Sequence, residues 1–487
     1  MQQGRKTLAG RTEGPHDGTV DQLHALDAEF LLLEDGVDHM HIGACAVLEG
    51  PCPTPAETEA WVRAALPSIP RYRQRLRNVP FGIGRPGWED AEDFDLSNHL
   101  LTISLPSPGG ADELEALVGQ VMSTELDRAH PLWELWVVEG LDGDQWAVIA
   151  KVHHCLVDGL AGMALLQALL DTEPDPPEVV GDDWRPGPGP SDTRLLVDAV
   201  GDLVHPLLAA PGWAWHQLTH PVDTVRRLGA LTSGLVTFAG TVPPTGRSSL
   251  DGPVGPGRRW TTATTTLDRA KAIRAERGGT VNDVVLAAVT RGLRDLLLAR
   301  GEDPGTVELR AAIPVSVRTD HEALDNQVSA IVITLPVGVS TPELRFQVLR
   351  AETQRLKASH EAEAGQLATG LADLVPAPLV AAGTAVAHRL LRRHPQRNVS
   401  TVITNVPGPQ FPLYAAGRRM LRYLPFVPVA LGVRIAVAIV SYDGGLAFGI
   451  TGDEASTPDL EVVARGIEAA IDELDAPTGG GASLHGA

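Results

Sequence analysis

Residues 151–171, KVHHCLVDGLAGMALLQALLD, place His153 and His154 side by side, with Asp158 and Gly159 a short distance downstream. The run after Asp158 is nearly all apolar, which predicts a buried helix that follows a turn. A histidine at the carboxyl end of a strand, where the chain turns into a helix, is well placed to face a cleft. This stretch therefore predicts a strand, turn and helix with imidazole chemistry at the turn.

The residues before the histidines predict a β-hairpin. Residues 135–141 (LWVVEGL) and 145–154 (QWAVIAKVHH) are rich in apolar, β-branched and aromatic residues, and Asp142-Gly143 between them is a strong turn signal. Alternation along the second strand places His153 and His154 on opposite faces. Two ligands of one metal ion need ring nitrogens that converge about 2 Å from a common centre. We therefore expect no metal site here.

The pattern favours a single catalytic histidine. A neutral imidazole with a pKa near 6.5 accepts a proton from an alcohol as the alcohol attacks an activated acyl group, and we assign this role to His154. His153 is interpreted as a structural histidine below the site. Asp158 either holds the loop by pairing with an arginine or orients the base, and an Asp-Gly pair before a helix favours the first role. Cys155 is a poor nucleophile candidate, because neighbouring side chains on an extended chain point apart.

Several further motifs occur in a fixed order along the chain. Together with the His-His-x3-Asp-Gly string they resemble the bacterial wax ester synthase/diacylglycerol acyltransferase family, within the superfamily of CoA-dependent acyltransferases. The likeness covers nearly the whole sequence. The motifs are LHALDAEFLLLED (23–35), HMHIGACAVLEG (39–50), WEDAEDFDLSNHL (88–100), DRAHPLWELWVVEGL (127–141), TVNDVVLAAV (280–289), IPVSVR (313–318), TNVPGPQFPLYAAG (404–417) and SYDGGLAFGITGD (441–453).

The resemblance implies a fold and a set of site residues. The fold is α/β, of the α+β type, with two lobes that are each a mixed sheet flanked by helices and with a channel between the lobes. His154 is implied as the general base, His153 and Asp158 as structural supports, and Gly159 as the residue that permits a tight turn. No metal and no cofactor are expected, and acyl-CoA is implied as a co-substrate.

The resemblance also points to candidates on the substrate side of the channel. In the first lobe these are Pro131, Leu132 and Trp133 of the Pro-Leu-Trp motif. In the second lobe Asn282 lines or shapes the channel, or else Asn282 or Asp283 is only the cap that starts a helix. Arg318 is the candidate partner of Asp158, by analogy with an Asp–Arg bridge in the superfamily, or else a surface arginine.

With 487 residues, the chain is too long for one ordinary core and suggests two lobes. Segments rich in Pro, Gly and acidic residues mark the connections between them. The expected units are a disordered start (1–19), an N-terminal lobe (20–172), a linker with bridging helices (173–258), a C-terminal lobe (259–476) and a disordered tail (477–487).

Hydrophobic periodicity predicts the main elements of the second lobe. We expect strands at 259–267, 308–317, 328–336 and 434–442, and helices at 269–276, 282–300, 342–360 and 459–474.

Charge and composition limit the partners. The net charge of −21 argues against nucleic acid and against adhesion driven by acidic lipid. The stretches 195–238 and 376–397 resemble interfacial amphipathic helices, or pack on their own lobes. The arginines of RYRQRLR (71–77) meet CoA phosphates or form a solvated face.

Three cysteines and a start without an apolar signal region favour a reducing cytoplasm. The expected protein is thus a cytoplasmic O-acyltransferase, peripherally associated with membrane or lipid bodies, that moves a fatty acyl group from acyl-CoA to diacylglycerol. The alternatives are wax ester synthesis from long-chain alcohols, or a non-catalytic protein that binds lipid or coats lipid bodies.

Overall fold

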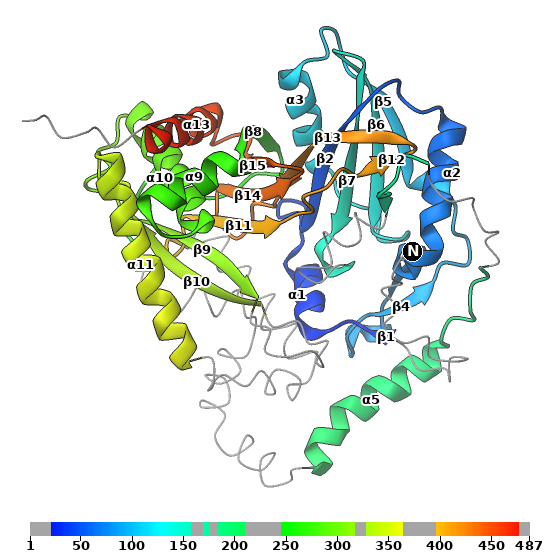
Figure 1. The fold of residues 1–487 in the computed structure, drawn as a ribbon. Helices are drawn as coiled ribbons and strands as arrows, with labels where there is room; N and C mark the ends of the chain where they lie inside the picture. Colours follow the sequence, from blue (N-terminus) through cyan, green and yellow to red (C-terminus); the bar gives the residue numbers. More distant parts are fainter. Residues whose placement is uncertain are drawn as a thin grey trace, which may run out of the picture.

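The computed structural model describes residues 21–156, 169–175, 184–209, 245–316, 328–363 and 396–476. These residues form two lobes, each built on a six-stranded sheet (Figure 1). The predicted disordered ends lie outside the described residues, as do most of the helix expected after Asp158 and most of the stretch 376–397. Within the described part, no helix combines the length and apolar character needed to cross a membrane.

The N-terminal lobe contains a mixed sheet whose strands follow the order β12-β13-β2-β7-β6-β5. Only β5 and β6 are parallel, and the other pairs are antiparallel. The bounds are β2 His41–Glu49, β5 Leu100–Ser104, β6 Trp133–Leu141, β7 Gln145–His153, β12 Tyr414–Ala415 and β13 Arg418–Phe426. A small sheet with the order β1-β4-β3 consists of β1 Asp21–Gln22, β4 Gly87–Asp90 and β3 Gln74–Arg77.

Three helices and five short 3₁₀ turns complete this lobe as described. They are α1 Ala25–Leu33, α2 Pro55–Ala65, α3 Ala111–Met122, η1 Leu66–Ser68, η2 Pro70–Arg73, η3 Pro80–Gly82, η4 Leu96–Asn98 and η5 His154–Leu156. Helix α2 begins at a capping box, in which Thr54 accepts a hydrogen bond from the Glu57 backbone and Glu57 accepts one from the Thr54 backbone. A further helix, α5 Asp192–Ala209, packs against η3.

The predicted hairpin is confirmed. Strands β6 and β7 pair in an antiparallel manner around the Asp142-Gly143 turn, where Gly143 has a positive φ of 69° that suits glycine. All residues of β7 after Gln145 are buried. The hairpin therefore forms the centre of the lobe and delivers His153 to the end of a rigid strand.

The C-terminal lobe has a mixed sheet with the order β10-β9-β11-β14-β15-β8, in which β11 is parallel to both of its neighbours. Four helices cover one face of this sheet (Figure 1). The strands are β8 Arg258–Thr266, β9 Leu309–Ser316, β10 Val328–Leu335, β11 Thr401–Pro407, β14 Ile435–Tyr442 and β15 Gly445–Asp453, and the helices are α9 Leu267–Arg277, α10 Val281–Ala299, α11 Pro342–Glu363 and α13 Glu461–Asp475.

All eight elements predicted for this lobe are present, with small differences at their ends. Strand β14 (IAVAIVSY) explains why the prediction succeeds. Every one of its residues is buried, as expected for a central strand covered on both faces. Helices α10 and α13 pack on each other through apolar faces that include Leu293, Leu296, Val463 and Ile467.

One crossover departs from the predicted domain ranges. Strands β12 and β13 lie within the range assigned to the C-terminal lobe, yet β13 pairs with β2 in the N-terminal sheet, with Leu424 opposite Cys45. Leu424 and Phe426 are buried in the core of the N-terminal lobe. Neither lobe is therefore one continuous segment of the chain. Residues 414–426 link the two lobes, because they lie between strands of the C-terminal sheet in the sequence but belong to the N-terminal sheet.

Further contacts hold the lobes in place. The buried Arg258, at the start of β8, donates hydrogen bonds to the backbone carbonyls of Val37 and Val429. Its own backbone N–H donates to Ser123 Oγ at the end of α3. A Cβ atom at Gly119 would lie 2.7 Å from the Arg258 carbonyl oxygen, so α3 approaches β8 closely because this position has no side chain.

Candidate active site

The two histidines of the motif occupy different secondary structures. His153 is the last residue of β7, and His154 begins the 3₁₀ turn η5. The His153 side chain is fully buried, whereas His154 is partly exposed. Their backbone amides are held by different neighbours: the N–H of His153 donates to the Leu132 carbonyl at 3.0 Å and that of His154 to the Met40 carbonyl at 2.8 Å.

The His154 ring lies against helix α1. It stacks on Phe30, with ring centroids 3.9 Å apart and planes inclined by 24°. Its Nδ1 atom is buried and has no hydrogen-bond partner among the described residues. Burial lowers the pKa of His154 to about 4. The backbone of His154 itself raises this pKa in part, and the neighbouring His153 lowers it further. The ring is therefore a neutral imidazole at physiological pH, which is the form that a general base requires.

The two ring nitrogens of His153 face different neighbours. The backbone N–H of Cys155 donates to its Nδ1 at 3.1 Å. Its Nε2 lies 3.3 Å from Oε2 of Glu34. Since Nδ1 accepts a hydrogen bond, the neutral ring carries its proton on Nε2, facing the carboxylate. His153 thus contacts the backbone of the turn that carries His154, and its role as a structural support stays a prediction.

Glu34 was not identified from the sequence, although it lies in the quoted segment 23–35. It is the C-cap residue of α1, and its side chain is only 4 % exposed. His41 of β2 also contacts it, with 3.1 Å between Nε2 and Oε1, and Arg128 donates to Oε2 at 2.7 Å. The available signal was weak: a charged residue directly after the apolar run FLLL, and a His-x-His pair, of which His39 precedes β2 and His41 begins it.

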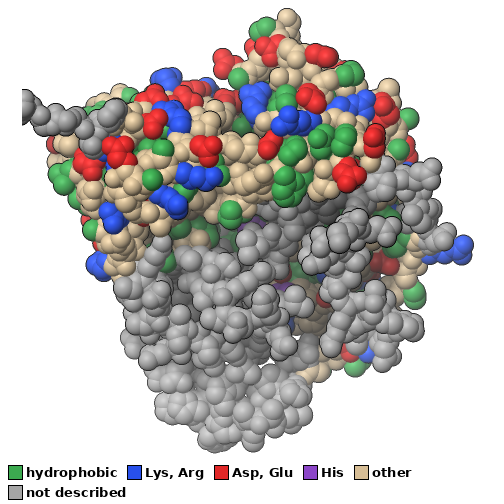
Figure 2. Space-filling model, in the orientation of Figure 1, with side chains coloured by type: hydrophobic (Ala, Val, Ile, Leu, Met, Phe, Trp, Pro, Cys, Tyr) green, Lys and Arg blue, Asp and Glu red, His purple; other side chains and the backbone are tan. Residues whose placement is uncertain are grey.

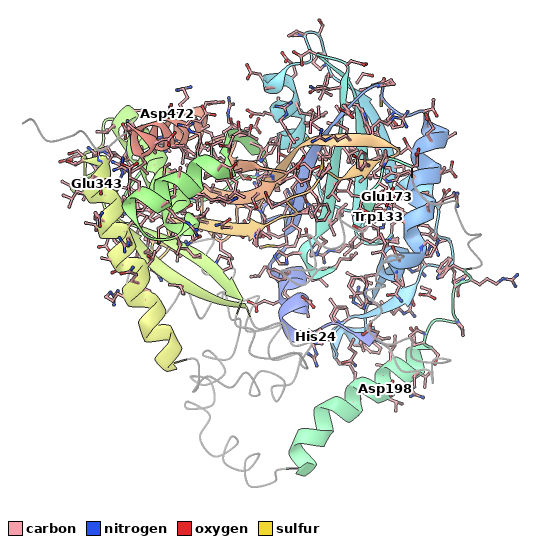
Figure 3. The ribbon with its side chains drawn as sticks, viewed as in Figure 1. His24, Trp133, Glu173, Asp198, Glu343 and Asp472 are labelled. Atoms are coloured by element: carbon pink, nitrogen blue, oxygen red, sulfur yellow. The ribbon has the colours of Figure 1, made fainter. Side chains whose placement is uncertain are left out.

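The Pro-Leu-Trp motif is buried in the core of the N-terminal lobe. Pro131 and Leu132 are buried, and Trp133 is 1 % exposed. The Trp133 Nε1 donates to the Tyr72 carbonyl at 2.9 Å, and its ring stacks on His99 at a centroid distance of 4.4 Å. Figure 3 places Trp133 inside this lobe, away from the C-terminal lobe. These contacts support the hairpin from below, and a contact of the motif with substrate stays a prediction.

The second-lobe candidate Asn282 lies in the first turn of α10, but it is not the cap. The N-cap is Thr280, whose Oγ1 accepts from the Asp283 backbone, while Asp283 accepts from the Thr280 backbone. The expectation that Asn282 or Asp283 caps the helix is thus wrong, because the helix already begins at Val281 and its N-cap is Thr280. Asn282 instead accepts a hydrogen bond from Asn405 of β11, at 3.2 Å.

Three candidates lie outside the described residues: Asp158, Gly159 and Arg318. The proposed pairing of Asp158 with Arg318 stays a prediction. Among the residues that the structure does describe, no group of three or more His, Cys, Asp or Glu side chains is placed to hold a metal ion.

The arginines of residues 71–77 are engaged with acidic and aromatic side chains. Arg71 pairs with Asp21, Arg75 with Glu89 and Asp93, and Arg77 with Asp192. Arg73 lies over the ring of Trp184 at 4.9 Å. These contacts give the arginines a structural role, although Arg73 is buried rather than solvated, and their contact with CoA phosphates stays a prediction. On the face drawn in Figure 2, acidic and basic side chains are likewise interspersed over the described surface.

Comparison with known families places this arrangement in context. Residues 23–285 match the family described as wax ester synthase/diacylglycerol acyltransferase catalytic domain, and residues 324–475 match its C-terminal domain. The chain belongs to the wax ester synthase/diacylglycerol acyltransferase family. It is therefore an acyltransferase, and the resemblance drawn from the motifs is confirmed.

Relatives extend over nearly the whole chain. A probable diacylglycerol O-acyltransferase of Mycobacterium tuberculosis is 36 % identical over 470 residues, which cover 93 % of this chain and 96 % of the relative. A putative diacylglycerol O-acyltransferase, also from M. tuberculosis, is 30 % identical, and the match covers 93 % of this chain and 90 % of the relative.

Solved structures agree with the two-lobed fold. The wax ester synthase/diacylglycerol acyltransferase of Marinobacter aquaeolei VT8 has a TM-score of 0.67 at 24 % identity, and the match covers 93 % of this chain and 98 % of that one. The first condensation domain of the calcium-dependent antibiotic synthetase has a TM-score of 0.57 at 15 % identity, covering 94 % and 98 %. The predicted fold class of this family member is thereby confirmed.

Proposed function

We propose that this acyltransferase moves a fatty acyl group from acyl-CoA to the hydroxyl of diacylglycerol and so forms triacylglycerol, with His154 as the general base. The observation that carries the proposal is the neutral, partly exposed imidazole of His154, fixed at the end of a buried strand in a member of this family. Only the two substrates are required, with no cofactor. The names of the relatives favour diacylglycerol over a long-chain alcohol as acceptor.

The proposed step is a direct transfer. The acceptor oxygen attacks the thioester carbonyl carbon while His154 takes the hydroxyl proton, a new ester C–O bond forms, and the C–S bond breaks. The imidazolium then returns its proton to the departing sulfur, which leaves as the thiol of CoA. A positioned base of this kind contributes roughly 10²- to 10⁴-fold to the rate.

The neighbouring thiol does not offer a competing covalent route. Burial raises the pKa of Cys155, and the nearby carboxylates of Asp27 and Glu34 raise it further. The thiolate is the nucleophilic form of cysteine, so a buried thiol with a raised pKa is inert. The contact that Cys155 makes with His153 comes from its backbone N–H and not from its sulfur.

We also propose peripheral association with a membrane or lipid body, because diacylglycerol must be drawn from an apolar phase. The supporting surface, here called the α5 surface, consists of Phe81, Val197 and Val200, which are 90 %, 62 % and 47 % exposed. Leu195 and Ala199 on the other side of α5 pack on Val79 beside η3, so the exposed residues project away from the lobe. Helix α5 stands at the edge of the molecule (Figure 1).

The proposed reaction is tested by the release of CoA from acyl-CoA, followed with a thiol reagent, without acceptor, with diacylglycerol and with a long-chain alcohol. We expect diacylglycerol to increase the release more than the alcohol, and triacylglycerol to appear as the lipid product. Faster release with the alcohol would identify a wax ester synthase instead. Release that no acceptor increases would identify a lipid-binding protein without turnover.

A further inference from the structure

Below the catalytic turn lies a buried carboxylate that contacts three side chains from separate parts of the chain and accepts a hydrogen bond from the Met40 backbone at 3.4 Å. Glu34 ends α1 and contacts His41 of β2, His153 of β7 and Arg128, at 3.1, 3.3 and 2.7 Å. His41 and His153 lie directly opposite each other in the pairing of β2 with β7. The two oxygens of one carboxylate thus join the helix before β2 to the strand that carries the His-His motif.

The carboxylate of Glu34 is ionised. Burial alone raises its pKa, but contacts with His153 and His41 outweigh burial and hold the pKa well below the usual range. Burial lowers the pKa of His41 to about 3, so that this ring is neutral. The compensating positive charge comes from Arg128, whose side chain is 47 % exposed. A buried charge is tolerated only when it is paired in this way.

This charge determines which nitrogen of His153 carries the proton. A carboxylate accepts hydrogen bonds and donates none, so a proton on Nε2 of His153 is favoured where this atom lies 3.3 Å from Oε2 of Glu34. Nδ1 is then free to accept the hydrogen bond from the Cys155 backbone, at 3.1 Å. The Cys155 N–H belongs to the peptide that follows His154. The orientation of that peptide, and with it the His154 ring, therefore depends on the tautomer of His153.

We propose that Glu34 is a positioning residue for acyl transfer: it fixes the Nε2–H tautomer of His153, and His153 in turn holds the η5 turn that presents His154 to the acceptor hydroxyl. The inference rests on the proposed role of His154 as the base. Helix α1 contributes twice to this arrangement, because it also carries Phe30, which stacks on the His154 ring.

Positioning and electrostatic tuning predict different kinetics. The pKa of His154 is lowered by burial and by His153, with no direct contribution from Glu34. Loss of Glu34 should therefore lower kcat while the KM for acyl-CoA and the acid limb of the pH–rate profile stay nearly unchanged. The titratable and charged groups that face Glu34 are His39, His41, Arg128, Lys151, His153 and Cys155.

The experiment compares the full-length Glu34→Gln variant with Glu34→Asp. Glutamine keeps the size of the side chain, but its amide group offers a donor where His153 needs an acceptor. We expect kcat to fall roughly 10- to 100-fold, since small displacements of a catalytic group have effects of this size. Aspartate keeps the charge, and we expect it to restore part of the rate. Thermal unfolding is measured for each variant so that the comparison uses folded protein.

A matched control and a double mutant complete the test. Glu125→Gln changes an acid that is 52 % exposed and lies 3.9 Å from His39, in the same neighbourhood but without contact with His153, so its kcat should match wild type. If Glu34 acts through His153, adding Glu34→Gln to a His153→Gln variant should lower kcat little further than His153→Gln alone does.

Two results overturn the inference: a wild-type kcat in Glu34→Gln, or fully additive losses in the double mutant. Either result leaves the base role intact as long as His154→Ala is inactive. An active His154→Ala variant would instead refute the proposed function itself. The two failures are therefore distinguishable.

Discussion

Replacement of His154 by alanine should remove proton transfer and little else. The side chain contacts Phe30 by stacking, and its Nδ1 has no hydrogen-bond partner among the described residues, so the variant breaks no buried hydrogen-bond network that the structure contains. An aromatic stack contributes about 0.5–1.5 kcal/mol to folding. The midpoint of thermal unfolding should therefore fall by only a few degrees. The rate should fall by at least about 100-fold, or roughly 2.7 kcal/mol in activation free energy.

The assay is release of CoA at saturating acyl-CoA and diacylglycerol, with acyl-CoA binding measured separately. The control is His130→Ala, which removes a histidine that is 37 % exposed and pairs with Asp127 on the surface of the same lobe. His130→Ala should keep wild-type activity, and His154→Ala should keep wild-type affinity for acyl-CoA. Near-full activity in folded His154→Ala protein would refute the reasoning, because the adjacent imidazole of His153 is fully buried and its Nδ1 already accepts a hydrogen bond from the Cys155 backbone.

Three further predictions test the environment of the site. Burial lowers the pKa of His154 to about 4, so the base stays unprotonated on acidification, and the acid limb of kcat/KM in reversibly folded protein should lie below about pH 6. A limb above that value contradicts the burial. Phe81→Glu should weaken flotation with zwitterionic liposomes at low and high salt, whereas Leu298→Glu, which changes an exposed leucine of the other lobe, should not. Asn282→Ala and Asn405→Ala should each destabilise the fold by about 0.5–1.5 kcal/mol, without additivity in the double mutant.

The sequence predicted those parts of the fold that local pattern determines. The apolar run of β14, the Asp142-Gly143 turn and the periodic helices α10 and α13 depend on residues close together in the chain. The placement of β13 does not. Its residues pair with β2, near the start of the chain, and no local signal states which of two sheets a strand will join. The domain ranges drawn from the sequence therefore missed this crossover.

The candidate site likewise contains residues that a local sequence pattern reveals and residues that it does not. His153 and His154 were found because their spacing from Asp158 and Gly159 forms a contiguous string. The Thr280–Asp283 capping box is also a local pattern, although the cap was expected at Asn282 or Asp283. Glu34 was missed because burial of a charged side chain depends on partners far away in the sequence. Arg128, which supplies the positive charge that pairs with Glu34, lies 94 residues further along the chain.

Arg128 supplies the positive charge that pairs with the buried carboxylate of Glu34. A carboxylate that lies buried inside a lobe would pay a large desolvation cost without a cation nearby. The Arg128 side chain is half-exposed, and besides Glu34 it contacts the backbone carbonyl of Leu31 in α1. Arg128 and His153 both contact Oε2 of Glu34, so the positive charge is paired directly with the buried carboxylate. The base can remain a neutral imidazole while the charge that orders its support stays paired.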